Sequence, residues 1–333
     1  MAGWRSFEPP PFRSRVVPLA RGALLLDDCF NASPLSMRAA LEALRDPVWA
    51  GRPKVVVLGD MLDLGGESEK WHLDLAGWLS EMEGVRACLF GAAMGVVAAR
   101  LAALGEGQTV NGHMVSGDPI ELVAGMEVPE GGIVLVKGSR GMRLERVVHH
   151  LELRWARDRR AAIEAASRWV TLVAVTGSGR EAVASAVAAA LRGSGRPVGY
   201  GGETGIFVGD ERVAGRRGGE GLSELLFRSA AAGAGVAVVS LRHGELLSAA
   251  EDFHFEVVVH TGLSAGDLPS GVDAETHLAH VAQLVVRGGG PRALVLCDGD
   301  PGCDLLAEVA PAGTQVLRYG DPAEAARLST GAL

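Results

Sequence analysis

The chain has 333 residues, of which 48% are hydrophobic and 22% charged, and it contains 46 glycines. This length and composition predict a globular α/β protein of two domains, each able to bury its own core. The net charge of -8, without a long basic run, argues against nucleic acid as a partner. No apolar run approaches the roughly 20 residues of a membrane span, and the first residues have no apolar signal-peptide core, so we expect a cytoplasmic protein.

In chain order, residues 1–21 are rich in Pro and Arg and are expected to form an arm. A strand at 22–28 ends in two aspartates, and Ser33-Pro34 predicts an N-cap and first helical residue for a helix to about Arg45. Strands and helices then alternate, which predicts a doubly wound parallel sheet. The further strands are expected at 54–60, 85–91 and 131–137, and the helices at 67–82, 92–104 and about 142–155.

A second alternation follows the charged stretch 154–168, so we divide the chain into an arm (1–21), a first domain (22–155), a linker (156–167) and a second domain (168–333). A hairpin is expected at 205–213 with its turn at Gly209-Asp210. The expected strands are 170–175, 197–200, 235–240, 256–260, 292–297 and 314–318, and the expected helices are 181–192, 219–232, 273–287, 302–309 and 321–328.

Polar residues follow several strands of the first domain. They are Asp27-Asp28 with Asn31, Gly59-Asp60, and Lys137-Gly138-Ser139-Arg140. Ligands of open α/β sheets bind at the carboxyl ends of the strands, where an aspartate can bind a ribose and Lys or Arg a carboxylate or phosphate. The residues alone leave the alternative open that Asp28 caps a turn and Lys137 is a solvated strand end.

Three ordered stretches, "LLLDDCFNASPLSM", "VVVLGDMLDLGGESEKWH" and "IVLVKGSRG", resemble the Mur ligase family. They are similar to the C-terminal domain of its D-alanyl-D-alanine-adding branch (MurF), over residues 5–152. The departures are Phe30 for Tyr, Ser33 for Asn and Asp63 for Glu. The resemblance implies a Rossmann-like domain in which Asp28 and Asn31 approach the ribose and base of a nucleotide. It also implies that Lys137, Ser139 and Arg140 form a loop facing the amino-acid substrate.

Residues 168–330 resemble the central, P-loop-NTPase-like domain of the same family, closest to its MurE type, but in degenerate form. The stretch Thr176-Gly177-Ser178-Gly179-Arg180 follows a strand and precedes a helix, as a phosphate-binding loop does. It is one residue short, and Arg180-Glu181 stands where the family has Lys-Thr. The other departures are Ser240 for a Mg²⁺-binding Glu, Gly262 in an Asn-Leu-Ser-Arg-Asp-His run, and Cys297 and Gly299 in an Asn-x-Asp-Asp-Pro run.

The chain has three lysines, Lys54, Lys70 and Lys137, so its second half offers none to a phosphate or for carbamylation. The resemblance therefore implies a pseudoenzyme: a protein of peptidoglycan precursor synthesis that is not an autonomous ligase and has no catalytic residue of its own. It would supply its C-terminal-type domain to a partner Mur ligase, or act as a scaffold for one. ATP and Mg²⁺ would bind only where a partner completes the site. The alternatives are a split D-alanyl-D-alanine-adding ligase active only in complex, and a nucleotide or muropeptide binding module without turnover.

We expect no metal site. Cys297 and Cys303 are too isolated to suggest zinc, and His277 and His280, three apart on one predicted helix, have no carboxylate motif of a known metal site beside them. These two histidines are expected on a solvated surface. The four cysteines are scattered along the chain, as in a cytoplasmic protein.

Overall fold

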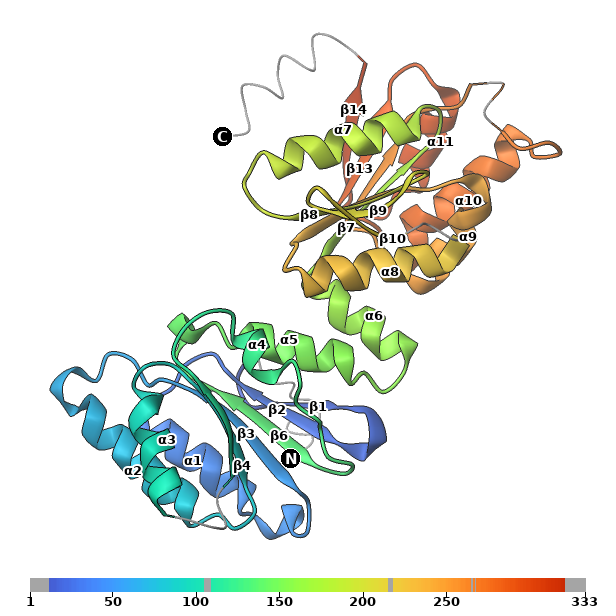
Figure 1. Cartoon of the computed structure of the whole chain (residues 1–333). Coiled ribbons are helices and arrows are strands. Elements are labelled where there is room, and N and C mark those ends of the chain that lie inside the picture. Colours follow the sequence, from blue (N-terminus) through green and yellow to red (C-terminus); the bar gives the residue numbers. More distant parts are fainter. Residues whose placement is uncertain (1–11, 105–108, 215–217, 265, 267, 321–333) are drawn as a thin grey trace. The chain divides into compact units, whose positions relative to one another are not determined.

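The computed structural model describes residues 12–104, 109–214, 218–264, 266 and 268–320. The chain divides into two compact units, unit 1 (Met1–Ala162) and unit 2 (Ile163–Leu333), and the division falls within α6 (Arg159–Ser167). Each unit has its own sheet with helices on both faces, which confirms the predicted α/β class (Figure 1). Among the described residues, no helix is both long and apolar enough to cross a membrane.

The sheet of unit 1 has six strands in the order β1-β2-β6-β3-β4-β5. They are β1 (Arg15–Pro18), β2 (Leu24–Asp28), β3 (Lys54–Gly59), β4 (Arg86–Phe90), β5 (Thr109–Met114) and β6 (Ile133–Lys137). Strand β1 is antiparallel to β2 and the other pairs are parallel. The sequence predicts only an arm over residues 1–21, whereas residues 15–18 of it close one edge of the sheet.

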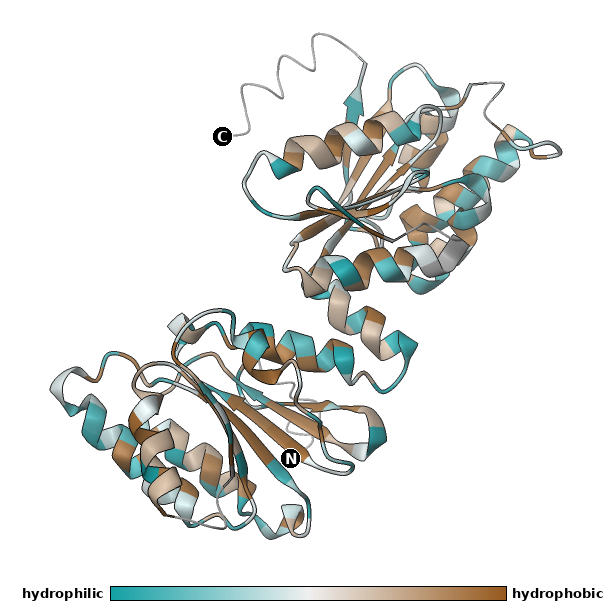
Figure 2. Cartoon of the chain, viewed as in Figure 1, coloured by the Kyte–Doolittle hydropathy of each residue, from teal (hydrophilic) through white to brown (hydrophobic). Residues whose placement is uncertain are grey.

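Helices cover both faces of this sheet, and the strands between them are its most hydrophobic part (Figure 2). The helices α1 (Pro34–Leu44), α2 (Ser68–Ser80) and α3 (Met94–Ala103) pack on one face, and α4 (Pro119–Val123) and α5 (Glu145–Arg154) on the other. The predicted start of α1 is confirmed. The Ser33 side chain accepts a hydrogen bond from the Ser36 N–H, Ser36 Oγ accepts one from the Ser33 N–H, and Pro34 follows the cap.

The sheet of unit 2 has eight strands in the order β10-β9-β8-β11-β7-β12-β13-β14. They are β7 (Thr171–Thr176), β8 (Val198–Gly202), β9 (Gly205–Val208), β10 (Glu211–Ala214), β11 (Val236–Ser240), β12 (Val257–His260), β13 (Ala293–Cys297) and β14 (Gln315–Tyr319). The pairs of β9 are antiparallel and the others parallel, and the expected hairpin forms with its turn at Gly209-Asp210.

The helices of unit 2 are α7 (Arg180–Arg192), α8 (Gly218–Ala231), α9 (Leu246–Asp252), α10 (Ala274–Val286) and α11 (Pro301–Val309). Helix α7 packs on one face of the sheet, against Val173, Val175 and Val238. The short α9 is not expected from the sequence, and the helix expected at 321–328 lies outside the described residues.

Candidate functional site

Strand β6 lies between β2 and β3, so the carboxyl ends of these three strands meet at one edge of the sheet of unit 1. The register of β2 and β6 pairs Asp28 with Lys137. The Lys137 ammonium lies 2.5 Å from Asp28 Oδ2 and donates a second bond of 3.2 Å to the Asn31 carbonyl oxygen. Lys137 is only 2% exposed. The structure thus brings together three of the residues that the sequence singles out.

The second oxygen of the Asp28 carboxylate is bound by a residue that the sequence analysis missed. Both the backbone N–H and the hydroxyl of Ser14 donate to Asp28 Oδ1, over 3.1 and 3.2 Å. Ser14 directly precedes β1, which pairs with β2 and so brings the arm back to this edge. The Asp28 carboxylate is therefore fixed from both sides.

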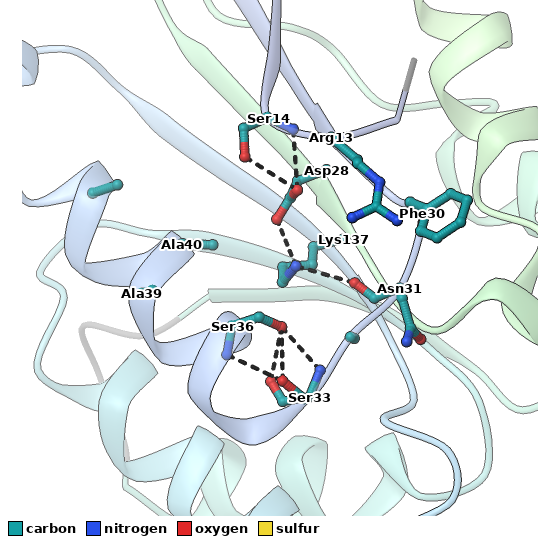
Figure 3. A pocket seen from close by; sticks show the side chains of 12 residues that line it. Arg13, Ser14, Asp28, Phe30, Asn31, Ser33, Ser36, Ala39, Ala40 and Lys137 are labelled. Atoms are coloured by element: carbon teal, nitrogen blue, oxygen red, sulfur yellow. Dashed lines mark hydrogen bonds and ion pairs between the residues drawn. The ribbon is translucent and has the colours of Figure 1, made fainter. Parts of the chain in front are cut away.

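A pocket of about 470 Å³ opens beside this carboxylate (Figure 3). The Arg13 guanidinium lies 4.1 Å from the centre of the Phe30 ring, and the Arg140 guanidinium lies 5.8 Å from the same ring. Small and hydroxyl-bearing residues along α1 form another part of the wall. The lining residues are Arg13, Ser14, Asp28, Phe30, Asn31, Ala32, Ser33, Ser36, Ala39, Ala40, Ala43 and Lys137.

Two other predicted residues at this edge are engaged with the backbone. The Ser139 hydroxyl accepts a hydrogen bond from the Leu62 N–H (2.8 Å) and is 3% exposed. The Asp60 carboxylate accepts bonds from the N–H groups of Ala93 and Met94, at the start of α3. An acceptor at a helix N-terminus satisfies donors that the helix itself leaves free. Ser139 and Asp60 therefore hold loops in place rather than line the pocket.

In unit 2, the loop of residues 176–179 is bound by the neighbouring loop 261–264. The Ser178 N–H donates to the Gly262 carbonyl oxygen (2.9 Å), and the Thr261 hydroxyl lies within hydrogen-bond distance of the carbonyl oxygens of residues 176 and 178. Gly177 has a φ of +97°, and a Cβ there would lie 2.5 Å from the Gly262 oxygen. The glycine is thus needed for a close backbone approach in this loop.

The two residues after this loop have partners within the protein. The Arg180 guanidinium forms an ion pair of 2.9 Å with Glu203. Glu181 Oε1 accepts hydrogen bonds from the Tyr200 hydroxyl (2.6 Å) and from the Glu203 N–H (2.8 Å). The side chains of Arg180 and Glu181 therefore tie α7 to the residues around the end of β8.

The expectation of solvated histidines was wrong for His277, which is 4% exposed. Its Nδ1 lies 3.1 Å from His243 Nδ1, and the His280 ring stacks on that of His243 with centroids 4.8 Å apart. The i, i+3 spacing was visible in the sequence, but the residues facing it come from elements distant in the chain. Among the described residues, no group of three or more His, Cys, Asp or Glu side chains is placed to hold a metal ion.

Comparison with protein families gives a match within unit 1. Residues 12–140 match the family described as "Mur ligase, glutamate ligase domain". Residues 12–140 of unit 1 are thus similar to a Mur ligase domain. The match includes every residue of the edge just described, from the arm at Arg13 to Arg140 after β6.

The matching part of unit 1 has relatives among curated proteins. It is 30% identical over 139 residues to the UDP-N-acetylmuramoyl-tripeptide–D-alanyl-D-alanine ligase of Bacillus subtilis, covering 42% of this chain and 30% of that one. The ligase of the same name from Escherichia coli is 32% identical over 154 residues, with 45% of this chain and 32% of that one covered. The chain thus spans about a third of the length of these relatives.

Among solved structures, the MurF ligase from Thermotoga maritima in complex with ADP matches 44% of this chain and 31% of its own, with 28% identity and a TM-score of 0.35. A UDP-N-acetylmuramoyl-L-alanyl-D-glutamate–2,6-diaminopimelate ligase matches 72% of this chain and 46% of its own, with 15% identity and a TM-score of 0.42.

Proposed function

We propose that this chain acts in peptidoglycan precursor synthesis by supplying its Mur ligase domain to a separate chain that binds ATP and the UDP-linked precursor. The reaction would be the ATP-dependent addition of D-alanyl-D-alanine, as the names of the relatives state for those proteins. The observation that carries the proposal is the Asp28–Lys137–Asn31 arrangement beside the pocket of unit 1.

The pocket has the chemistry of a nucleotide site. Phe30 offers an aromatic face that is 39% exposed, with Arg13 and Arg140 beside it for stacking and for negative charge. The Asp28 carboxylate, fixed by Ser14 and Lys137, is an acceptor suited to ribose hydroxyls. A volume of about 470 Å³ accommodates part of a nucleotide rather than a macromolecule.

Unit 2 supports the choice of a partner rather than an autonomous ligase. Its loop 176–179 has no lysine and is bonded to loop 261–264, and Arg180 is paired with Glu203. Phosphoryl transfer needs fixed cations around the phosphates. In this proposal, the lysine and the Mg²⁺ ligands come from the partner, and unit 1 closes over the nucleotide from the other side.

Reconstitution tests this function. The full chain is mixed with a D-alanyl-D-alanine-adding ligase truncated before its own C-terminal domain, with UDP-MurNAc-tripeptide, D-alanyl-D-alanine, ATP and Mg²⁺. We expect phosphate release and the pentapeptide product only when both chains are present. Arg13→Ala should lower the rate at least tenfold. The control Arg45→Ala removes a surface ion pair with Glu81 and should leave the rate unchanged. Absence of product from a mixture that forms a stable complex contradicts the proposal.

A second candidate, a nucleotide-binding module without turnover, is favoured by the fact that the pocket is built from unit 1 alone. Calorimetry of the purified chain with ADP and with ATP–Mg²⁺ separates the two. Micromolar binding that is abolished by Arg13→Ala but not by Arg180→Ala, without product in the reconstituted mixture, would favour the module. Binding that requires Arg180 would instead assign the nucleotide to loop 176–179.

A further inference from the structure

Four histidines from three elements gather near the carboxyl edge of the sheet of unit 2. This histidine cluster consists of His243 in the 3-10 helix η6 (His243–Glu245), His260 at the end of β12, and His277 and His280 on α10. Besides the 3.1 Å contact of His243 with His277, the rings of His260 and His277 have centroids 6.0 Å apart. The cluster thus joins α10 to η6 and to the sheet.

Two of the four rings, those of His260 and His277, are buried, and the cluster leaves much of its hydrogen-bonding capacity unused. His260 is fully buried, and both its ring nitrogens lack a hydrogen-bond partner in the described part of the chain. The same holds for Nε2 of His277 and Nδ1 of His280. A buried imidazole tolerates this arrangement while it is neutral, whereas a buried imidazolium needs a counter-charge.

The groups facing the cluster offer little counter-charge. Arg180 on α7 is a cation, and its charge lowers the pKa of His277. Arg242, next to His243, is a second cation, and its side chain and N–H both donate to the Glu245 carboxylate, over 2.9 Å. The Glu203 carboxylate is bound by Arg180.

On the other side of the cluster lies Asp300, just before α11. The charge of its carboxylate raises the pKa of His260, against the effect of burial. Its oxygens accept hydrogen bonds from the N–H groups of Leu263 (2.8 Å) and Gly302 (2.7 Å). The Cys303 thiol on α11 contacts the His260 carbonyl oxygen, and burial raises the pKa of this thiol to about 11, so it stays neutral.

Burial is the main cause that lowers the pKa of His260 and of His277 to about 4 each, from an ordinary 6.5. The pKa of His277 is lowered further by the charges of its neighbours, which are His260, His243, His280 and Arg180. Burial and then His280 also lower the pKa of His243. His260 and His277 are therefore neutral in the folded unit at pH 7, and the lowered pKa of His243 favours its neutral form. One ring of the His243–His277 pair can then donate an N–H···N bond to the other.

We propose that the histidine cluster is a proton-sensitive latch, which keeps α10 and η6 against the sheet while its rings are neutral and releases them when the rings are protonated. When both His243 and His277 carry two ring protons, neither can accept, so their bond is lost and two cations face each other. His260 directly precedes Thr261, whose hydroxyl lies against the carbonyl oxygens of the 176–179 loop. Opening of the latch therefore also loosens the contact that closes this loop.

The size of the effect follows from proton linkage. The open state has ordinary histidines and binds protons below pH 6.5, whereas the closed state resists protonation until about pH 4. The free energy by which the neutral cluster stabilises the closed state is therefore complete above pH 6.5 and is lost as the pH falls toward 4. Between pH 7 and pH 5, the opening equilibrium should rise about 20-fold for one such histidine and several hundred-fold for two.

Hydrogen–deuterium exchange of the full chain tests the latch, with rates corrected for the intrinsic effect of pH. Peptides covering residues 274–286 should exchange several hundred-fold faster relative to the intrinsic rate at pH 5 than at pH 7, while peptides of unit 1 should not. His277→Leu should reduce this dependence to about 20-fold. The control His254→Leu alters an exposed histidine paired with Glu256 and should behave as the unaltered chain.

Two results would overturn the proposal. One is corrected exchange of α10 that changes less than threefold between pH 7 and pH 5, or that keeps its full pH dependence in His277→Leu. The other comes from NMR titration of the ring nuclei in the unaltered chain, which needs no variant to fold. If the rings of His260 and His277 titrate near pH 6.5 with the unit still closed, the cluster is no latch.

Discussion

The ion pair of Asp28 and Lys137 should respond unequally to loss of its two members. In Asp28→Ala, the Lys137 ammonium, 2% exposed, keeps one described partner, the Asn31 carbonyl oxygen. Removal of one member of a buried pair costs about 3–5 kcal/mol. In Lys137→Met, the Asp28 carboxylate is 21% exposed and keeps both bonds from Ser14, so we expect a cost of about 1–3 kcal/mol.

The double variant Asp28→Ala/Lys137→Met leaves no buried charge. It should therefore be more stable than Asp28→Ala alone, with a coupling energy of about 2 kcal/mol.

Urea unfolding measures these free energies. Because a chain of two units need not unfold in one step, the transition of unit 1 has to be followed separately. Tryptophan fluorescence mainly reports it, since of the described tryptophans only Trp169 lies in unit 2. If Lys137→Met costs as much as Asp28→Ala, or if the two losses simply add, the account of a buried ammonium held by one main partner is wrong.

Three further changes have defined outcomes. Gly177→Ala should lower the stability of unit 2 by about 1–3 kcal/mol in thermal unfolding, because φ is +97° and a carbonyl oxygen of the facing loop lies 2.5 Å from the new Cβ; an unchanged melting temperature contradicts this. Arg15→Met should cost unit 1 about 3–5 kcal/mol in urea, because the fully buried Asp27 carboxylate loses its cation; a loss below 1 kcal/mol would show that other donors suffice. Burial and the Asp27 carboxylate raise the pKa of the Cys29 thiol, so a thiol-alkylating reagent at pH 8 should modify the half-buried Cys297 first and Cys29 only on unfolding; mass spectrometry of the folded chain decides.

The sequence predicted the strands with continuous apolar runs and the start of α1, because these depend on neighbouring residues. It did not predict β1, since four residues ending in Pro18 become a strand only by pairing with β2. It also missed β5 (Thr109–Met114), which interrupts its apolar residues with Asn111, Gly112 and His113. Both are edge strands, whose pairing is decided by the rest of the sheet.

In the site, too, features that depend on neighbouring residues could be predicted, and those that depend on the rest of the fold could not. Asp28 and Lys137 could be placed at strand ends from the sequence, but their contact depends on β6 lying beside β2, 109 residues away along the chain. The hydrogen bonds from Ser14 to Asp28 could not be predicted, because the direction of the chain at Ser14 is set by the pairing of β1. The histidine cluster was missed for a related reason. Histidines at i and i+3 on a helix predict a solvated face as long as the elements that pack on this face are unknown.

The residues that follow β1 are tied to the residues that follow α5. Leu19 forms a β-bridge with Ala156, and the Ala20 N–H donates to the Trp155 carbonyl oxygen over 2.7 Å. Because β1 and the Arg15–Asp27 ion pair lie just before this bridge, a graft of unit 1 into a loop of another protein has to begin before β1 and end after Ala156.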